Sequence, residues 1–125
     1  MTFSDAEIEY LATQRLGRLA TVAPDGTVQN SPVGFSVDTD HGVINVRGWN
    51  LAQSRKFRNL ATNHNVAFVV DDIVSLDPWT VRCLEIRGTA EALHEEGDVI
   101  RIHPRRIIGW GMGPDGTTSS KRSID

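Results

Sequence analysis

Ser54, Arg55 and Lys56 are the residues whose types and spacing most clearly indicate chemistry. They stand where a helix is predicted to begin, after a predicted strand at residues 43–47. The N-terminus of a helix carries unpaired N–H groups and partial positive charge, so adjacent cations there are unfavourable unless an anion binds beside them. Arginine offers a planar fork to phosphate oxygens and lysine a point charge. The pattern indicates a phosphate site, and a solvated basic helix face is the alternative that spacing alone leaves open.

The start of this helix has two interpretations. Asn50 is a possible earlier cap, which would move the two cations into the second turn. The apolar face of the helix includes Phe57 but not Leu51, and this favours a start at Ser54. We therefore predict a helix over residues 54–63 with Ser54 as its cap and as a further donor to the anion.

Two other segments carry residue types suited to a planar ligand. The first is Asn30, Ser31, Pro32 and Val33, and the second is Arg47, Gly48 and Trp49. Polar groups of the first segment could hydrogen-bond the edge of a heterocycle, and a solvent face with an edge-strand proline is the alternative. In the second segment the glycine allows close backbone approach, and the indole is either a pocket wall or an ordinary packed side chain.

Trp79 and Trp110 follow predicted loops in a chain with only 6% aromatic residues. Each indole could cover a flat ring, but packing in a dimer interface is the preferred interpretation. Cys83 has no neighbouring base in the sequence and is interpreted as inert. The sequence holds no nucleophile elbow, zinc motif or Gly-rich dinucleotide loop, and its four histidines lack metal-ligand spacing. We nominate no catalytic residue and no metal ligand, which favours a bound cofactor as the carrier of the chemistry.

Composition limits the class of protein. The chain has 125 residues, enough for one core, with 39% hydrophobic and 23% charged residues. A net charge of −3 argues against general nucleic-acid binding, so any basic site is local. We find no apolar run for a membrane span and no signal-peptide pattern. A single cysteine fits a reducing compartment, and we expect a cytoplasmic protein.

Turn signals and hydrophobic periodicity predict two short helices and six strands. Ser4 and Glu7 form a capping box for the first helix. The expected helices are residues 5–14 and 54–63, and the expected strands are residues 16–23, 28–38, 43–47, 66–72, 81–94 and 99–110. Residues 66–72 are apolar on both faces and should be fully buried. Residues 73–79 are expected as a loop.

The longest predicted strand should bend at a bulge at Gly88, and the last should be interrupted at Pro104. These elements predict a mainly β fold, a closed or partly closed antiparallel barrel with short helices. We assign residues 1–112 to a single barrel domain. Residues 113–125, which are rich in Gly, Ser and Thr, are expected to form a mobile tail.

Five motifs occur in order and with consistent spacing over roughly residues 4–112: LGRLATV with PDG (16–22 and 24–26), QNSPV (29–33), SRKFRNL (54–60), EIRGTA (85–90) and IHPRRIIGWG (102–111). Together they resemble the pyridoxamine 5′-phosphate oxidase-like flavin and deazaflavin oxidoreductases. The last motif resembles the actinobacterial branch that uses the deazaflavin coenzyme F420. The resemblance implies a six-stranded split β-barrel and a homodimer with cofactor sites at the subunit interface.

The resemblance also implies roles for the candidate residues. Ser54, Arg55 and Lys56 would hold the cofactor phosphate, and the segment Asn30 to Val33 would line the isoalloxazine-like ring. Arg47, Gly48 and Trp49 would approach the ribityl chain and the phosphate. Residues of the partner subunit would complete the pocket, from around Trp79 and from Trp110 to Met112.

The chain departs from the pyridoxamine phosphate oxidases proper. The strand after Pro32 lacks the basic, leucine-rich motif of those enzymes, and their C-terminal Arg/His segment is not evident. We therefore predict a reductase that transfers hydride from reduced F420 to a conjugated small-molecule acceptor whose identity the sequence leaves open. The alternatives are an FMN-binding oxidoreductase, a carrier of a cofactor or tetrapyrrole, and a dimeric interaction module without a ligand.

Overall fold

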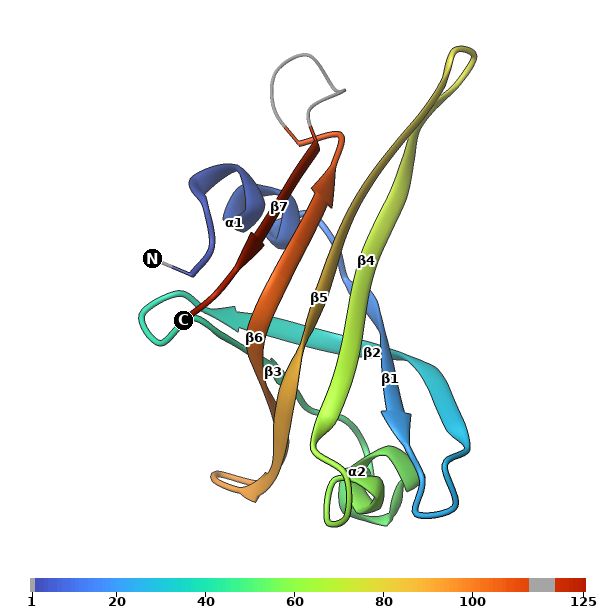
Figure 1. The fold of residues 1–125 in the computed structure, drawn as a ribbon, viewed down its shortest axis with the longest axis vertical. Coiled ribbons are helices and arrows are strands. Elements are labelled where there is room, and N and C mark those ends of the chain that lie inside the picture. Colours follow the sequence, from blue (N-terminus) through green and yellow to red (C-terminus); the bar gives the residue numbers. More distant parts are fainter. Residues whose placement is uncertain (1, 113–118) are drawn as a thin grey trace.

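The computed structural model describes residues 2–112 and 119–125. Alternating apolar and polar residues form long antiparallel strands, and the sheet order is β3-β2-β1-β4-β5-β6-β7 (Figure 1). The elements are α1 (Asp5–Ala12), β1 (Leu16–Val22), β2 (Val28–Asp38), β3 (Val43–Val46), the short 3₁₀ helix η1 (Leu51–Gln53), α2 (Arg55–Asn59), β4 (Asn65–Leu76), β5 (Trp79–His94), β6 (Asp98–Trp110) and β7 (Ser119–Ser123).

Pairing of β3 with β6 closes the first six strands into a ring. Ile44 lies opposite Ile102, and Val46 lies opposite Ile100, in this antiparallel contact. All four side chains are at most 1% exposed, so the closing contact is part of the core. The predicted six-stranded antiparallel barrel is confirmed, and β7 adds a seventh strand beside β6.

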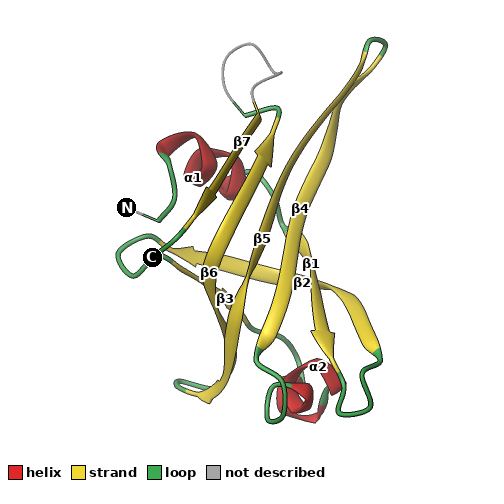
Figure 2. Ribbon diagram, viewed as in Figure 1, coloured by secondary structure: helices red, strands yellow, loops and turns green. Residues whose placement is uncertain are grey.

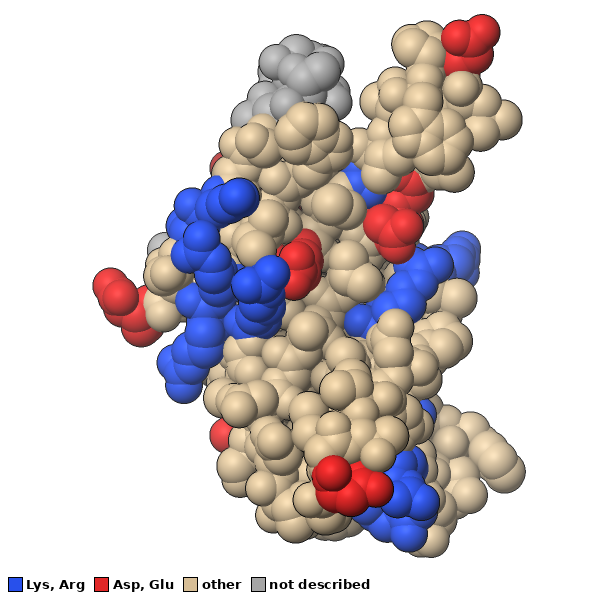
Figure 3. Space-filling view, turned by 45° about the vertical axis from the view of Figure 1, so that its right-hand side comes forward, with Lys and Arg blue, Asp and Glu red and all other residues tan. Residues whose placement is uncertain are grey.

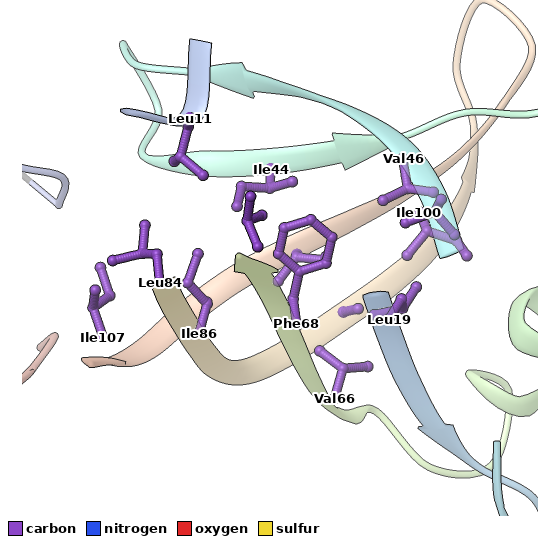
Figure 4. Packing of buried hydrophobic residues seen from close by; sticks show 14 of the residues in the cluster. Leu11, Leu19, Ile44, Val46, Val66, Phe68, Leu84, Ile86, Ile100 and Ile107 are labelled. Carbon is purple, nitrogen blue, oxygen red and sulfur yellow. The ribbon is translucent and has the colours of Figure 1, made fainter. Parts of the chain in front are cut away.

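The core lies inside the ring and is built mainly from aliphatic side chains, with the aromatic ring of Phe68 among them. Phe68 of β4 is fully buried, with Leu19, Ile44 and Ile86 around it (Figure 4). Each of these side chains comes from a different strand, so the cluster ties the two halves of the ring together. Burying a side chain of this size stabilises the fold by about 1.5–3 kcal/mol.

The two helices lie at opposite ends of the barrel (Figure 2). The capping box of α1 is confirmed, because Ser4 Oγ accepts from Glu7 N and Glu7 Oε1 accepts from Ser4 N. Ser54 is confirmed as the cap of α2, since its Oγ accepts from Phe57 N at 3.3 Å. Asn50 has a positive φ and begins the preceding 3₁₀ turn instead. The helix ends at Asn59, earlier than predicted.

The predicted loop at residues 73–79 is wrong. β4 continues to Leu76 and β5 begins at Trp79, so the two strands form an arm that projects beyond the ring (Figure 1). The arm is rich in apolar and β-branched residues that favour a strand but bury little surface. Its exposed large apolar side chains are Ile73, Val74, Leu76 and Trp79.

The bulge predicted at Gly88 is confirmed, because the β5–β6 register shifts between Arg87 and Gly88. Gly88 lies opposite Pro104, and a Cβ added to Gly88 would lie only 2.1 Å from the carbonyl oxygen of His103. β6 therefore continues through Pro104 instead of being interrupted, with the irregularity absorbed by the glycine on the neighbouring strand.

An ion pair between Glu7 of α1 and Arg122 of β7 connects the N-terminal helix to the C-terminal strand. Arg122 donates to both carboxylate oxygens, at 2.8 and 2.5 Å, and to Thr2 O at 2.6 Å. The strand lies in the region predicted as a tail, whose residues 113–118 are outside the described residues. Burial raises the pKa of Glu7, but the hydrogen bonds from Arg122 and Ser4 outweigh it and hold that pKa below its ordinary value.

β4 is buried on only one face in the single chain. Val66, Phe68 and Val70 point into the core, whereas Ala67 and Val69 on the opposite face are half-exposed. The prediction of a fully buried strand is therefore wrong for the isolated chain. An outer face of small apolar residues remains open, and it matters for the site described next.

Candidate functional site

The first turn of α2 faces the turn between β1 and β2 across a cavity of about 570 Å³. Arg55 lines this cavity from the helix side, and Asp25, Val28 and Gln29 line it from the hairpin side. The Pro-Asp-Gly turn that ends β1 brings these residues back toward the helix. A segment predicted only as a turn thus forms one wall of the cation site.

Arg55 is exposed and Lys56 is half-buried. Among the described residues, neither side chain has a carboxylate within the 4.0 Å of an ion pair. The pKa of Asp25 lies below its ordinary value chiefly because Thr27 donates hydrogen bonds to it, and the charge of Arg55 is a minor cause. Arg55 lines the cavity and Lys56 follows it on α2, and two neighbouring cations without acidic partners among the described residues can receive an anion.

The charge at this place resides in the side chains more than in the helix dipole. α2 has only five residues, so few peptide dipoles align, and the Ser54 hydroxyl is already engaged. Ser54 Oγ donates to Leu51 O at 2.6 Å and accepts from Phe57 N. Of the three predicted phosphate residues, the structure leaves the side chains of Arg55 and Lys56 available and uses the Ser54 side chain as a cap.

Arg58, one turn further along α2, lines a different groove. This groove has a volume of about 670 Å³ and lies between α2 and β5, with Phe57, Leu60 and His94 among its lining residues. The structure therefore separates Arg58 from the cavity that Arg55 lines. Arg58 is therefore a suitable control for substitutions of Arg55, since both are arginines of α2 but line different cavities.

The predicted ring-lining residues of β2 divide between the two faces of the strand. Asn30 and Pro32 are exposed on the outer face, while Val33 is 5% exposed and packs in the core. Ser31 also points inward, and its buried Oγ has no hydrogen-bond partner among the described residues. Only Asn30 and Pro32 present their side chains directly to a ligand on the outer face.

A second depression, of about 380 Å³, lies on the outer face of the sheet. Asn30 lines it together with Arg18, Ala20, Ala67 and other residues of β1, β4 and β5. Val28 lines both this depression and the Arg55 cavity, so the two adjoin. An anion held by Arg55 would therefore sit at one end of a continuous surface that leads onto the open sheet.

The segment after β3 is exposed. Gly48 has open space around its Cα, since a Cβ added there would meet no atom within 4 Å. Trp49 is 95% exposed, so its indole is not packed within this chain. Arg47 donates to the carbonyl oxygens of Glu95 and Glu96 at 3.1 and 3.3 Å, which fixes its side chain on the β5–β6 turn.

The other predicted pocket residues lie far from α2 within one chain. Trp79 is 66% exposed on the projecting arm, and Trp110 is 48% exposed at the end of β6. The arm lies at the end of the barrel opposite α2 (Figure 1). Neither indole can complete the Arg55 cavity of its own chain in this arrangement.

Lys and Arg side chains lie in separate groups on this face, with acidic and uncharged surface between them, as the blue, red and tan atoms of Figure 3 show. This distribution fits the local basic site predicted from the net charge of −3. Within residues 2–112 and 119–125, no group of three or more His, Cys, Asp or Glu is placed to hold a metal ion. No helix in the described part of the chain is long and apolar enough to cross a membrane.

Cys83 lies on the outer face opposite Trp110. Burial raises the pKa of its thiol, and the nearby Asp71 and Glu85 carboxylates raise it further. The thiol is therefore protonated at neutral pH and is a poor nucleophile, as the sequence interpretation holds.

Sequence reasoning missed the residues that β1, β4 and β5 contribute to the outer face, chiefly Arg18, Ala67 and Glu85. They are brought together by strand pairing, between segments about fifty residues apart for β1 and β4 and about twenty apart for β4 and β5, which no local pattern encodes. One signal for the outer face is present in the sequence: residues 66–72 are apolar on both faces of the predicted strand. This pattern indicates that the outer face of the strand is covered as well as the inner one.

Comparison with known proteins identifies a family and a close relative. Residues 3–124 match the family model described as pyridoxamine 5′-phosphate oxidase. A curated relative from Streptomyces rimosus, a 5a,11a-dehydrotetracycline/5a,11a-dehydrooxytetracycline reductase, is 47% identical over 127 residues, which cover 94% of this chain and 89% of the relative.

Solved structures share the fold. A conserved hypothetical protein from Mycobacterium tuberculosis has a TM-score of 0.71 at 25% identity, covering 86% of this chain and 84% of its own. A structure named F420 Reductase has a TM-score of 0.57 at 26% identity, covering 71% of this chain and 85% of its own.

Proposed function

Because the chain belongs to the pyridoxamine 5′-phosphate oxidase family, whose matched relative is a reductase, we propose that this oxidoreductase uses coenzyme F420 to reduce a conjugated organic acceptor. Two comparisons support the finer part of the proposal. A relative is named as a reductase of dehydrotetracyclines, which are conjugated polycyclic compounds, and a structural neighbour is named F420 Reductase.

The observation that carries the proposal is Arg55 at the 570 Å³ cavity, with Lys56 next to it on α2. Within the described residues neither cation has an acidic partner, and the cavity adjoins an apolar sheet face through Val28. A ligand that suits this arrangement has an anionic tail and a flat ring system. F420 and FMN both have a three-ring heterocycle joined through a ribityl chain to a phosphate, and in F420 the phosphate carries a further acidic tail.

The residues present fit such a cofactor. Arg55 and Lys56 would bind the phosphate through charge-assisted hydrogen bonds. Gly48 leaves room for a ligand chain that passes close to the backbone, since even a Cβ at this position would have no atom within 4 Å. Asn30 and Pro32 would lie along the edge of the ring system on the outer face.

When bound, the reduced deazaflavin supplies a hydride. The residues of the chain anchor its phosphate, orient the ring and exclude water from one of its faces, which the half-buried Ala20, Ala67 and Val69 suit. We assign no side chain to proton transfer, because no acid or base of the described residues is both unpaired and close to the outer depression. Solvent is the source of the proton in this proposal.

A homodimer is part of the proposal. The exposed arm residues Leu76 and Trp79, with Trp110, form apolar surface that is costly to leave in water. The outer face of β4 is also apolar and open. A second copy would cover these surfaces and bring the arm of one subunit toward the other subunit's site, which the arm cannot reach within its own chain.

The experiment is a parallel titration of the purified protein with F420 and with FMN, followed by intrinsic tryptophan fluorescence. We expect saturable quenching with tighter binding of F420. Tighter binding of FMN would assign the protein to the flavin-dependent enzymes, and no binding of either would remove the cofactor site. Reduced F420 is then mixed with a panel of conjugated ketones, and loss of the reduced cofactor is expected. Tight binding without any oxidation of the cofactor would favour a carrier.

A further inference from the structure

The short helix α2 depends on the barrel for its position. It has five residues, fewer than an isolated helix needs to be stable in water, so contacts with the rest of the chain decide where it lies. Phe57 and the C-cap residue Leu60 supply apolar contacts, since they are 8% and 2% exposed. Burial of apolar surface is not directional, so these side chains hold the helix against the barrel without fixing its height or rotation.

A buried hydrogen bond between α2 and β1 supplies the missing direction. The Asn59 side chain donates through Nδ2 to Thr21 Oγ1 at 3.0 Å. Asn59 is 1% exposed, and Thr21 is fully buried. Among the described residues, no other hydrogen bond joins α2 to β1, to β2 or to the turn between them. A hydrogen bond weakens steeply when its length or angle changes, so this bond sets the position of α2 on β1.

The bond lies directly beside the cation site. Arg55 is four residues before Asn59 and Lys56 is three residues before it, and residues at these spacings share a helix face. Thr21 has a corresponding place on the opposite wall, because it pairs with Gln29 of β2, which lines the same cavity as Arg55. The hydrogen bond therefore joins the helix wall of the cavity to its hairpin wall.

Binding of an anion in this cavity requires the two walls to stay at a fixed separation. A charged hydrogen bond has a favourable length of about 2.7–2.9 Å between the heavy atoms, and a shift of the helix by about 1 Å would take it out of that range. Arginine and lysine side chains also lose rotamer freedom when they bind. A helix free to move would add to this entropy cost and weaken the binding of the anion.

We infer that Asn59 is a positioning residue, which holds α2 at the distance from the β1–β2 turn at which Arg55 and Lys56 bind one phosphate. It acts through its hydrogen bond to Thr21, and both residues are too deeply buried to touch the ligand. The inference rests on the proposed function for the identity of that ligand. A buried hydrogen bond also stabilises a fold whatever its function, so affinity and stability have to be measured separately.

Two substitutions of Thr21 separate affinity from stability. Thr21→Val keeps the shape of the side chain and removes the hydroxyl, whereas Thr21→Ser keeps the hydroxyl and removes a buried methyl group. Both should lower the free energy of unfolding in urea denaturation, the first because the Asn59 amide loses its partner and the second because of the cavity. By tryptophan quenching, we expect the affinity for F420 to fall about tenfold in Thr21→Val and to change less than about twofold in Thr21→Ser.

The double variant Thr21→Val, Asn59→Leu is the second test. It replaces both polar partners by apolar side chains of similar size and leaves no amide unpaired, so much of the stability lost in Thr21→Val should return. The directional link is still absent, so the affinity for F420 should stay about tenfold below that of the wild type. Return of the affinity together with the stability would overturn the inference, because Asn59 would then have a structural role only. Equal loss of affinity in Thr21→Val and Thr21→Ser would also overturn it.

Pyrophosphate tests the anion site without the ring system of the cofactor. In calorimetric titrations at low salt, we expect the wild type and Thr21→Ser to bind it with equal affinity and Thr21→Val to bind it about tenfold more weakly. Arg55→Ala should lose most of the binding, because Arg55 lines the cavity. Equal affinity for pyrophosphate in the wild type and Thr21→Val would overturn the inference.

The two ligands together separate this inference from the proposed function. Thr21-dependent binding of pyrophosphate by a protein that binds neither F420 nor FMN would support the positioning role and refute the cofactor. Binding of F420 with equal strength by the wild type and by Thr21→Val would support the cofactor and refute the positioning role. A protein that binds neither pyrophosphate nor either cofactor would refute both.

Discussion

Replacing Arg122 with alanine is expected to destabilise the fold strongly, because it leaves a buried carboxylate without its partner. Glu7 is only 2% exposed and receives two hydrogen bonds from Arg122, at 2.8 and 2.5 Å. Breaking a buried pair by removing one partner costs about 3–5 kcal/mol. The Arg122 side chain is 34% exposed, so water screens part of the interaction and the lower end of the range applies. We expect a loss of about 3 kcal/mol in the free energy of unfolding.

Urea denaturation at a fixed protein concentration measures this loss, since a dimer would make the midpoint depend on concentration. Arg105→Ala is the matched control, because Arg105 is exposed on the neighbouring strand and its substitution should change stability by less than about 0.5 kcal/mol. The double variant Glu7→Gln, Arg122→Ala should recover part of the loss, because it removes the buried charge itself.

The pH dependence of the Arg122 effect follows from the pKa of Glu7. That pKa lies below its ordinary value of 4.5 in the folded protein, so the pair stabilises the fold above pH 4.5 and is lost as the pH falls through the folded pKa. In Arg122→Ala the isolated buried carboxyl favours its neutral form. The difference between the two proteins should therefore shrink on acidification, beginning above pH 4.5, where the variant's carboxyl takes up its proton, and continuing below it. A difference under about 1 kcal/mol at pH 7, or one that does not change on acidification, would refute the reasoning.

Three further predictions concern an unpaired buried hydroxyl, a closely packed glycine and an exposed indole. Ser31→Ala should raise the free energy of unfolding by about 1 kcal/mol in urea denaturation, because it removes a buried hydroxyl without a partner among the described residues; a loss of stability would mean that the hydroxyl is bonded. Gly88→Ala should cost roughly 2–3 kcal/mol by the same assay, because the new Cβ would lie 2.1 Å from the carbonyl oxygen of His103, and a neutral result would contradict the close approach. Trp79→Ala should shift the protein toward monomer in sedimentation velocity, whereas an unchanged distribution would show that the arm is not part of a dimer interface.

Much of the barrel could be predicted from the sequence because its signals are local. Alternation placed the strands before residue 73 to within a few residues, and the Gly88 bulge follows from the length of a single strand. The Ser54 cap follows from the apolar face that includes Phe57. Each of these features depends on residues that are close to one another in the sequence.

The features that were missed depend on distant partners. β7 has the sequence SSKRS, without apolar alternation, and it is held by pairing with β6 and by Arg122 reaching Glu7. The glutamate was identified only as a capping residue, which it is, but its second partner lies 115 residues away. The arm was missed because its apolar residues have no core to indicate which face is buried.

The candidate site shows the same division. The cation pair was found from helix position and charge, and the structure places Arg55 in a cavity. The flat outer face was not found, because Arg18, Ala67 and Glu85 become neighbours only through the β1–β4 and β4–β5 registers. Alternation along β2 also means that two of its four predicted ring residues, Ser31 and Val33, point inward.

The most direct test of the account is the affinity for F420 of the wild-type protein, of the double variant Arg55→Ala, Lys56→Ala, and of Arg58→Ala, all measured by tryptophan quenching. Charged hydrogen bonds contribute about 1.5–3 kcal/mol each, so the double variant should bind at least about a hundredfold more weakly. Arg58→Ala should bind like the wild type, because Arg58 lines the separate groove between α2 and β5. Equal affinity in all three proteins, each shown to be folded by circular dichroism, would contradict the assignment of the phosphate to α2.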